Sequence, residues 1–63
     1  MPRTNVRVSL TDRDRIGFSI IVRVTQALRK AGHADLARMY QEEAIRGDYN
    51  HVLRVTREYV ITE

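Results

Sequence analysis

The stretch of sequence that decides the fold is RIGFSIIVRVTQALRKA, residues 15–31, the most apolar part of the chain. Over residues 16–24 apolar side chains alternate with other side chains, which is the pattern of a half-buried strand. A helix, which turns about 100° per residue, collects one continuous apolar arc: Ile16, Ile20, Ile21, Val24, Ala27, Leu28 and Ala31. Because alternation does not explain why residues 26–31 extend this arc, we interpret the stretch as a helix.

Boundary signals on both sides agree with the helix. Thr11 or Asp12 can cap the first free amides, and Gly32 stands where a C-terminal cap is expected. The sequence therefore predicts a helix over residues 12–31. Gly17 costs about 1 kcal/mol relative to alanine inside a helix, so we expect it to permit close packing.

Two apolar residues of this helix fall outside the arc. Phe18 and Val22 lie one turn apart, on a side that the arc does not cover. A helix that is apolar on more than one side usually has more than one neighbour. We expect either the N-terminal arm or a second chain to cover these two residues.

Two further helices are predicted, over residues 34–46 and 49–61. Gly47 ends the first of them, and Asp48 caps the next. The last helix has one apolar stripe, made of Tyr49, Val52, Leu53, Thr56, Tyr59 and Val60. Short connections favour antiparallel neighbours. The predicted fold is an all-α, three-helix bundle in one domain, residues 1–63, with a long central helix and an antiparallel helical hairpin.

Residues 1–10 are predicted to form an extended arm or a short strand. Val6, Val8 and Leu10 alternate with polar residues, as they would in a strand. A lone strand has unpaired edges and needs a partner. Two partners are open: the same strand of a second chain, or the surface over Phe18 and Val22.

The length of the chain favours self-association. Sixty-three residues bury only about 60% of their unfolded surface, and chains this small usually need a disulfide, a metal or a partner. Cysteine is absent, so we expect a homodimer. We predict an interaction surface made of Val6, Val8, Phe18 and Val22.

The chain shows no targeting or membrane-spanning pattern. Residues 2–10 have no sustained apolar core of the kind found in signal peptides. The apolar run over residues 16–24 is too short to span a bilayer. We therefore expect a cytoplasmic protein without a membrane partner.

Positive charge is concentrated in the first half of the chain. Residues 1–31 hold seven basic and two acidic side chains, and residues 32–63 hold four basic and six acidic ones. The halves thus carry about +5 and −2, which agrees with the total of +3. Such asymmetry can mark an anionic partner for the first half, and it can equally favour self-association or simply solvate a surface. The predicted contacts to an anionic partner are Arg7, Arg13, Arg15, Arg23 and Lys30.

Catalytic and metal-binding patterns are weak. His33 and His51 have no ligand spacing around them, and His33 is expected to help cap the second helix. The adjacent Glu42 and Glu43 point about 100° apart on a helix and do not form an acid/base pair. The three tyrosines are expected to pack inward with their hydroxyls reaching the surface. We therefore predict a non-enzymatic protein with no cofactor and no metal.

Three resemblances bear on function. The phrase Gly47-Asp48-Tyr49 resembles the helical hairpin of tetratricopeptide repeats, but the chain has room for only about one repeat. An arm followed by helices resembles ribbon-helix-helix repressors, which read DNA through a paired β-ribbon. That resemblance implies base contacts from Asn5, Arg7 and Ser9. The long first helix and the added third helix depart from that family.

The third resemblance covers just over half of the chain. The run ALRKAGHADLARMYQEEAIRGDYNHVLRVTREYV looks like small helical proteins of bacterial and phage type that have no assigned function. This likeness implies a helical architecture and an origin in a phage or mobile element. The sequence as a whole favours a small protein-binding module or regulator that acts as a homodimer. The alternative is a DNA-binding transcriptional regulator that uses the basic arm and the first helix.

Overall fold

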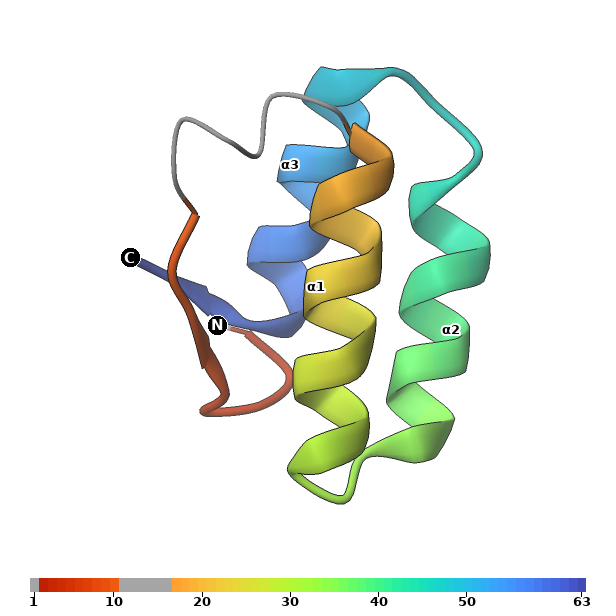
Figure 1. Cartoon of the computed structure of the whole chain (residues 1–63). Helices are drawn as coiled ribbons and strands as arrows, with labels where there is room; N and C mark the ends of the chain where they lie inside the picture. The colour runs from red at the N-terminus through yellow and green to blue at the C-terminus, as the bar shows by residue number, and fades with distance from the viewer. Residues whose placement is uncertain (1, 11–16) are drawn as a thin grey trace.

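The computed structural model describes residues 2–10 and 17–63, and its secondary structure is mainly helical (Figure 1). Helix α1 spans Gly17–Lys30, α2 spans Ala34–Ala44 and α3 spans Tyr49–Tyr59. Two short strands, β1 at Arg7–Val8 and β2 at Ile61–Thr62, form a parallel pair. All three helices pack against one another, and α2 runs against the direction of α1 and α3 in Figure 1.

The core is formed by the apolar faces of the three helices, by Val8 of β1 and by Val60, which directly follows α3. Four residues of the predicted arc belong to it: Ile20, Ile21, Val24 and Leu28. The helical interpretation of that stretch is therefore confirmed for residues 17–30. The buried apolar residues are Val8, Ile20, Ile21, Val24, Leu28, Ala37, Tyr40, Ala44, Val52, Val55, Tyr59 and Val60. The predicted start of the first helix at residue 12, and its cap at Thr11 or Asp12, lie outside the described residues.

Gly32 ends α1 as the sequence predicted. Its φ of 89° is the left-handed conformation that glycine adopts without a steric penalty. The Gly32 amide donates to the Arg29 carbonyl at 3.0 Å, and the His33 amide donates to the Leu28 carbonyl at 2.8 Å. These two bonds are the pair expected of a Schellman cap. They satisfy carbonyls that the helix end would otherwise leave free.

The arm at residues 2–10 pairs with the other end of the same chain. Ile61 donates its amide to the Val6 carbonyl at 2.8 Å, and the Glu63 amide donates to the Val8 carbonyl at 3.1 Å. The register aligns Arg7 with Ile61. The sequence offered two partners for the arm, a second chain or the surface over Phe18 and Val22, and the partner found is neither of them.

The same arm caps the C-terminal end of α3. The Arg3 amide donates to the Glu58 carbonyl at 2.9 Å, and both the amide and the hydroxyl of Thr4 donate to the Tyr59 carbonyl. The chain is extended at Val60, so α3 ends at Tyr59. A helix over residues 49–61 was predicted, but Ile61 belongs to β2, because the arm supplies the hydrogen bonds that a further helical turn would have made.

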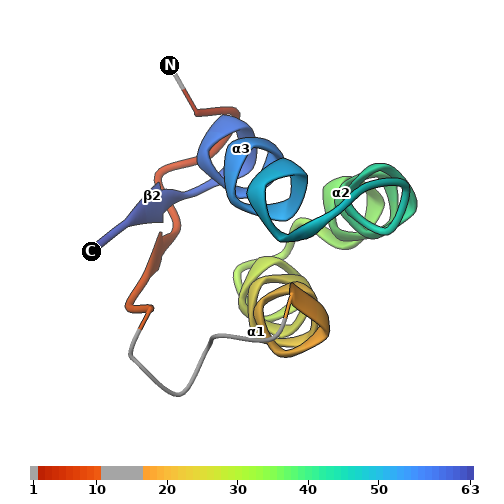
Figure 2. The same ribbon diagram turned by 90° about the horizontal axis from the view of Figure 1, so that it is seen from above.

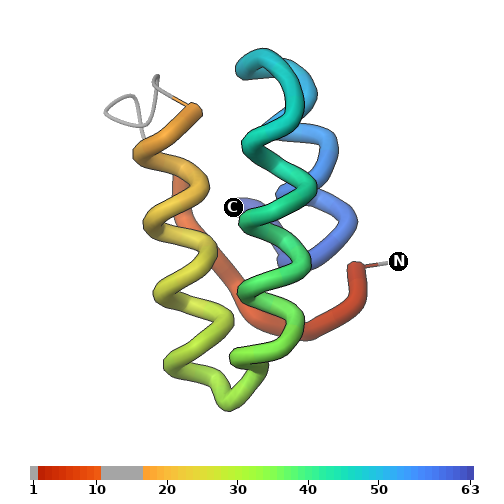
Figure 3. The backbone as a smooth tube through the Cα atoms, turned by 90° about the vertical axis from the view of Figure 1, so that its right-hand side faces the viewer, coloured from red at the N-terminus to blue at the C-terminus, as the bar shows by residue number. Residues whose placement is uncertain are grey.

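The strand pair lies outside the helices. Viewed along the bundle in Figure 2, β2 and the arm lie beside α1 and α3, on the side away from α2. Viewed from the α2 side in Figure 3, the arm crosses behind the helices. Within residues 2–10 and 17–63, no strand lies over the end of the bundle where α1 and α3 begin and α2 finishes (Figure 1). The second helix itself is shorter than the predicted range 34–46, since α2 ends at Ala44.

Candidate interaction site

A shallow apolar hollow of about 320 Å³ lies where three helix ends meet. Six apolar residues of α1, α3 and the end of α2 line it: Phe18, Ile21, Ala44, Ile45, Tyr49 and Val52. Ile21, Ala44 and Val52 are buried and form the floor. The rim is exposed: Phe18 keeps 69% of its surface accessible, Ile45 63% and Tyr49 40%. This combination of a buried apolar floor and an exposed apolar rim is what a side chain of a partner can fill.

Gly17 brings the first turn of α1 close to α3. A Cβ atom at this position would lie 3.3 Å from the Cγ2 atom of Val52, closer than a relaxed contact allows. An alanine here would therefore require the Val52 side chain to shift by a few tenths of an ångström. The close packing that the sequence predicted for Gly17 is what its surroundings require.

The connection from α2 to α3 is fixed by His51. Its Nε2 atom lies 3.0 Å from the Glu43 carbonyl at the end of α2. Its amide donates at 3.0 Å to the side chain of Asp48, which caps α3 as predicted. The imidazole also occupies the space where a Cβ atom of residue 47 would be, so only glycine fits at Gly47. This packing fixes the turn that carries Ile45.

Two of the four predicted interaction residues belong elsewhere. Val8 is buried in the core, and Val6 is partly buried against it. Val8 cannot contact a partner, because β1 holds it against the helices. Phe18 and Val22 are exposed as their place outside the arc indicated, but only Phe18 lines the hollow.

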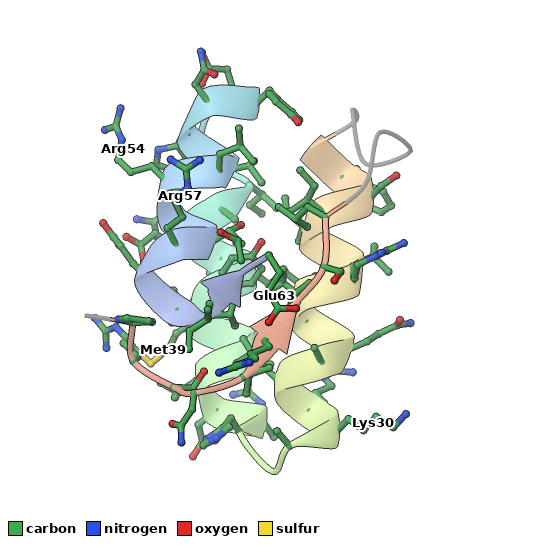
Figure 4. All side chains as sticks on the ribbon, turned by 90° about the vertical axis from the view of Figure 1, so that its left-hand side faces the viewer. Lys30, Met39, Arg54, Arg57 and Glu63 are labelled. Atoms are coloured by element: carbon green, nitrogen blue, oxygen red, sulfur yellow. The ribbon has the colours of Figure 1, made fainter. Side chains whose placement is uncertain are left out.

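The residues predicted to contact an anionic partner are not gathered in one place. Arg7 pairs with Glu63 across the strand ends at 3.4 Å, with both side chains largely exposed. Arg23 donates to the Ser9 carbonyl at 3.0 Å. Lys30 is the last residue of α1 (Figure 4). The remaining two, Arg13 and Arg15, lie outside the described residues.

The tyrosines of the core form a polar network rather than reaching the surface. Tyr40 and Tyr59 are almost fully buried, and their rings meet edge to face at 5.5 Å. The Tyr40 hydroxyl lies 2.7 Å from the hydroxyl of Thr56, and Tyr59 donates to the Glu43 carboxylate at 3.2 Å. The expectation that these hydroxyls reach the surface was wrong, because each finds a polar partner inside.

The same surroundings alter the chemistry of both phenols. Burial raises the pKa of Tyr40 above the usual 10.0. Burial and the hydrogen bond to Glu43 raise the pKa of Tyr59 as well. The Arg3 guanidinium lies over the Tyr59 ring, 5.1 Å from its centroid. Both phenols therefore stay protonated at neutral pH.

The histidines take structural positions. The His33 side chain makes no capping hydrogen bond to α2, contrary to the prediction, and only its carbonyl accepts the Ala37 amide. His51, for which the sequence indicated no ligand spacing, connects α3 to the end of α2 through its contact with the Glu43 carbonyl. Within residues 2–10 and 17–63, no group of three histidine or acidic side chains is placed to hold a metal ion.

Sequence reasoning missed two of the three rim residues. Ile45 was not assigned a face, and Tyr49 was placed on the inner stripe of its helix. Only a weak signal pointed to Ile45. This large β-branched residue comes directly before Arg46 and Gly47, at the end of the second predicted helix, where a side chain stands in a turn and not on a helix face. No pattern along the chain announces that Phe18, Ile45 and Tyr49 meet.

Comparisons with known proteins add no relative. No helix of the described chain is long and apolar enough to cross a membrane. Neither the family models, nor the curated proteins, nor the solved structures with which the chain was compared include a match.

Proposed function

We propose that this chain is a non-enzymatic protein-binding module and that the apolar hollow is its binding surface. The observation that carries the proposal is the exposed rim of Phe18, Ile45 and Tyr49 around a buried apolar floor. Soluble domains tend to bury residues of this size, and contiguous apolar surface of this kind marks an interaction site. The hollow is also rigid, since the packing at Gly17 and His51 fixes the helix ends that build it.

The area of the rim fits a weak complex between two copies of the chain. Side chains of this size have surfaces of about 200 Å² each, so the exposed fractions of Phe18, Ile45 and Tyr49 leave roughly 340 Å² per copy. Two copies face to face would bury about 700 Å² of apolar surface, and about 60% of an interface is apolar. The whole interface would then cover about 1,100–1,200 Å², at the lower end of specific complexes.

A two-fold axis provides the simplest arrangement of such a dimer. In an isologous interface the same patch serves on both copies. The exposed Phe18 of one copy would enter the hollow of the other, and its own hollow would receive the partner's Phe18. Each copy thus supplies one aromatic anchor and one apolar cavity, which is the usual composition of an interaction hot spot.

Sedimentation equilibrium over a range of concentrations tests the dimer. We expect reversible association, and we expect Phe18→Ser to weaken it more than about tenfold, because each of two anchors contributes at least about 1 kcal/mol. Met39→Ser is the matched control: it removes another exposed apolar side chain, 46% accessible, outside the hollow. A strictly monomeric chain at millimolar concentration, or equal effects of the two substitutions, would refute the proposed dimer.

A second candidate is a DNA-binding regulator that uses the arm. The observation in its favour is that Asn5, Arg7 and Ser9, the side chains expected to read bases, are all exposed. The arm differs from the β-ribbon of a ribbon-helix-helix repressor, which two chains share, because β1 is paired with β2 of the same chain. A salt-dependent anisotropy titration with duplex DNA tests it. Binding that is unchanged in Arg7→Ala with Arg23→Ala, or absent at low salt, would eliminate this candidate.

A further inference from the structure

A second hollow, of about 530 Å³, lies on the outer face of α3. Five residues of the helix line it, namely Asn50, Leu53, Arg54, Arg57 and Glu58. Their spacing of three and four residues places them on one face over two turns. These residues therefore form one continuous surface on α3. Its ends are polar, and its centre is apolar because Leu53 lies there and packs partly against the core.

The N-terminal arm provides one wall of this hollow. Pro2 lines it from outside the helix, and the next residue is fixed, since the Arg3 amide donates to the Glu58 carbonyl at 2.9 Å. Thr4 adds two further hydrogen bonds to the Tyr59 carbonyl. The wall is thus attached to the end of α3 and is a stable part of the surface.

The two arginines in the hollow are free of partners within the described chain. Neither Arg54 nor Arg57 makes a hydrogen bond or ion pair with the described residues, and both are exposed. Figure 4 shows them on the same outer side of α3. Arg7 and Arg3 differ, because the first pairs with Glu63 and the second lies over Tyr59. Positive charge without a partner in the described residues is thus present on α3, at two residues that the sequence analysis did not suggest.

We propose that the hollow at Arg54 and Arg57 binds an acidic protein segment that carries an apolar side chain between its carboxylates. Guanidinium groups bind carboxylates through paired hydrogen bonds. The apolar surface of Leu53 and Pro2 between them matches a leucine-sized side chain. The Asn50 amide can both donate and accept, which suits the backbone of a peptide.

The same surface is poorly suited to a nucleic acid. Single strands are held by aromatic side chains on which bases stack, and no aromatic residue lines this hollow. Glu58 stands at its edge, one turn after Arg54, and would repel a continuous row of phosphates. A peptide can place a neutral or basic residue opposite Glu58, so the combination of charges favours a protein segment.

Backbone amide shifts measured by NMR during a peptide titration test the proposal. The probe is a synthetic, end-blocked peptide that repeats Glu-Glu-Leu. We expect saturable shifts at residues 50–58 that weaken as ionic strength rises, because the contacts are exposed and screened. Matched probes that repeat Gln-Gln-Leu or Glu-Glu-Ser, which lack the charge or the apolar side chain, should bind at least about tenfold more weakly.

Variants of the protein complete the test. Arg54→Gln with Arg57→Gln should weaken binding about tenfold, whereas Arg54→Lys with Arg57→Lys, which keeps the charge, should retain most of it. The control is Arg29→Gln with Lys30→Gln, which removes the same charge from the far end of α1 and should leave the affinity unchanged. An equal loss in the control, or equal binding of the Gln-Gln-Leu peptide, would overturn the proposal.

The same variants test whether the partner is a protein segment or a nucleic acid. Duplex DNA should compete with the peptide weakly. If DNA instead bound this face more tightly than the peptide, and lost its affinity in the Arg54 and Arg57 variants, the protein segment would be refuted as the partner. The dimer is tested by separate substitutions at the other hollow, so either proposal can fail alone.

Discussion

The hydrogen-bond chain in the core predicts an asymmetry between two substitutions. Thr56 has one hydroxyl proton, and it donates that proton to the Val52 carbonyl at 2.7 Å. The contact of 2.7 Å between Thr56 and Tyr40 must then be a bond that Tyr40 donates. Tyr40 and Thr56 are both fully buried. Losing the acceptor therefore leaves a buried O–H group without a partner, while losing the donor leaves only a spare lone pair.

The magnitudes follow from that difference. Tyr40→Phe keeps the ring and its edge-to-face contact with Tyr59, and it should lower the free energy of unfolding by about 0.5–1.5 kcal/mol. Thr56→Val keeps the shape of the side chain but strands the Tyr40 hydroxyl, at about 1–3 kcal/mol. The double variant replaces both partners with apolar groups and should be no less stable than Thr56→Val alone. We expect it to be more stable by about 1 kcal/mol, which is a coupling between the two sites.

Urea unfolding followed by circular dichroism measures all four proteins of this cycle. The protein concentration should be low and equal throughout, because association would add to the apparent stability. A change of 1 kcal/mol corresponds to about 4–8 °C in Tm for a chain of this size, so the differences are within reach of thermal scans as well. Additive effects of the two substitutions, or a greater cost for Tyr40→Phe than for Thr56→Val, would refute the direction of the bond.

Three further predictions concern stability. Burial raises the pKa of Tyr40 and of Tyr59 above 10.0. The unfolded state therefore loses these protons at a lower pH than the folded state, and the free energy of unfolding should fall as the pH rises past 10. Titration of stability against pH checks this, with a shallower fall expected in Tyr59→Phe. Thr25→Val should raise stability by about 1 kcal/mol, because the buried Thr25 hydroxyl has no hydrogen-bond partner among the described residues; a urea midpoint below that of the parent protein would contradict it. Gly32→Ala should lower stability by about 1–2 kcal/mol, since its φ of 89° strains any side chain, and an unchanged melting temperature would show that the cap can rearrange.

Local signals predicted the helices well. The apolar arc of α1, the left-handed Gly32 and the cap at Asp48 depend on residues close in sequence, and the structure places them as expected. The strand pair was not predictable in the same way. Its bonds join residues such as Val6 and Ile61, which are 55 positions apart. Two residues of β2 are also too few to show a periodic pattern.

The candidate sites were predictable only in part. Phe18 was found because it falls outside the arc of its helix, a property of one element. Ile45 and Tyr49 became part of the hollow when three helix ends met, which is a property of the tertiary arrangement. The predicted contacts to an anionic partner stay a prediction, and charge counting along the chain does not reveal that Arg7 pairs with Glu63 across the strand ends.

The parallel strands at the two ends of the chain have a mechanical consequence. Tension applied between residues 2 and 63 would pull β1 and β2 along their axes in opposite directions. The bonds of Ile61 and Glu63 to β1 and its flanking residues would then be loaded in shear and would share the force, whereas antiparallel strands joined by a turn would separate one bond at a time. A small helical domain, usually soft under tension, is in this way closed by a clamp across its termini, and it should resist being pulled apart from either end.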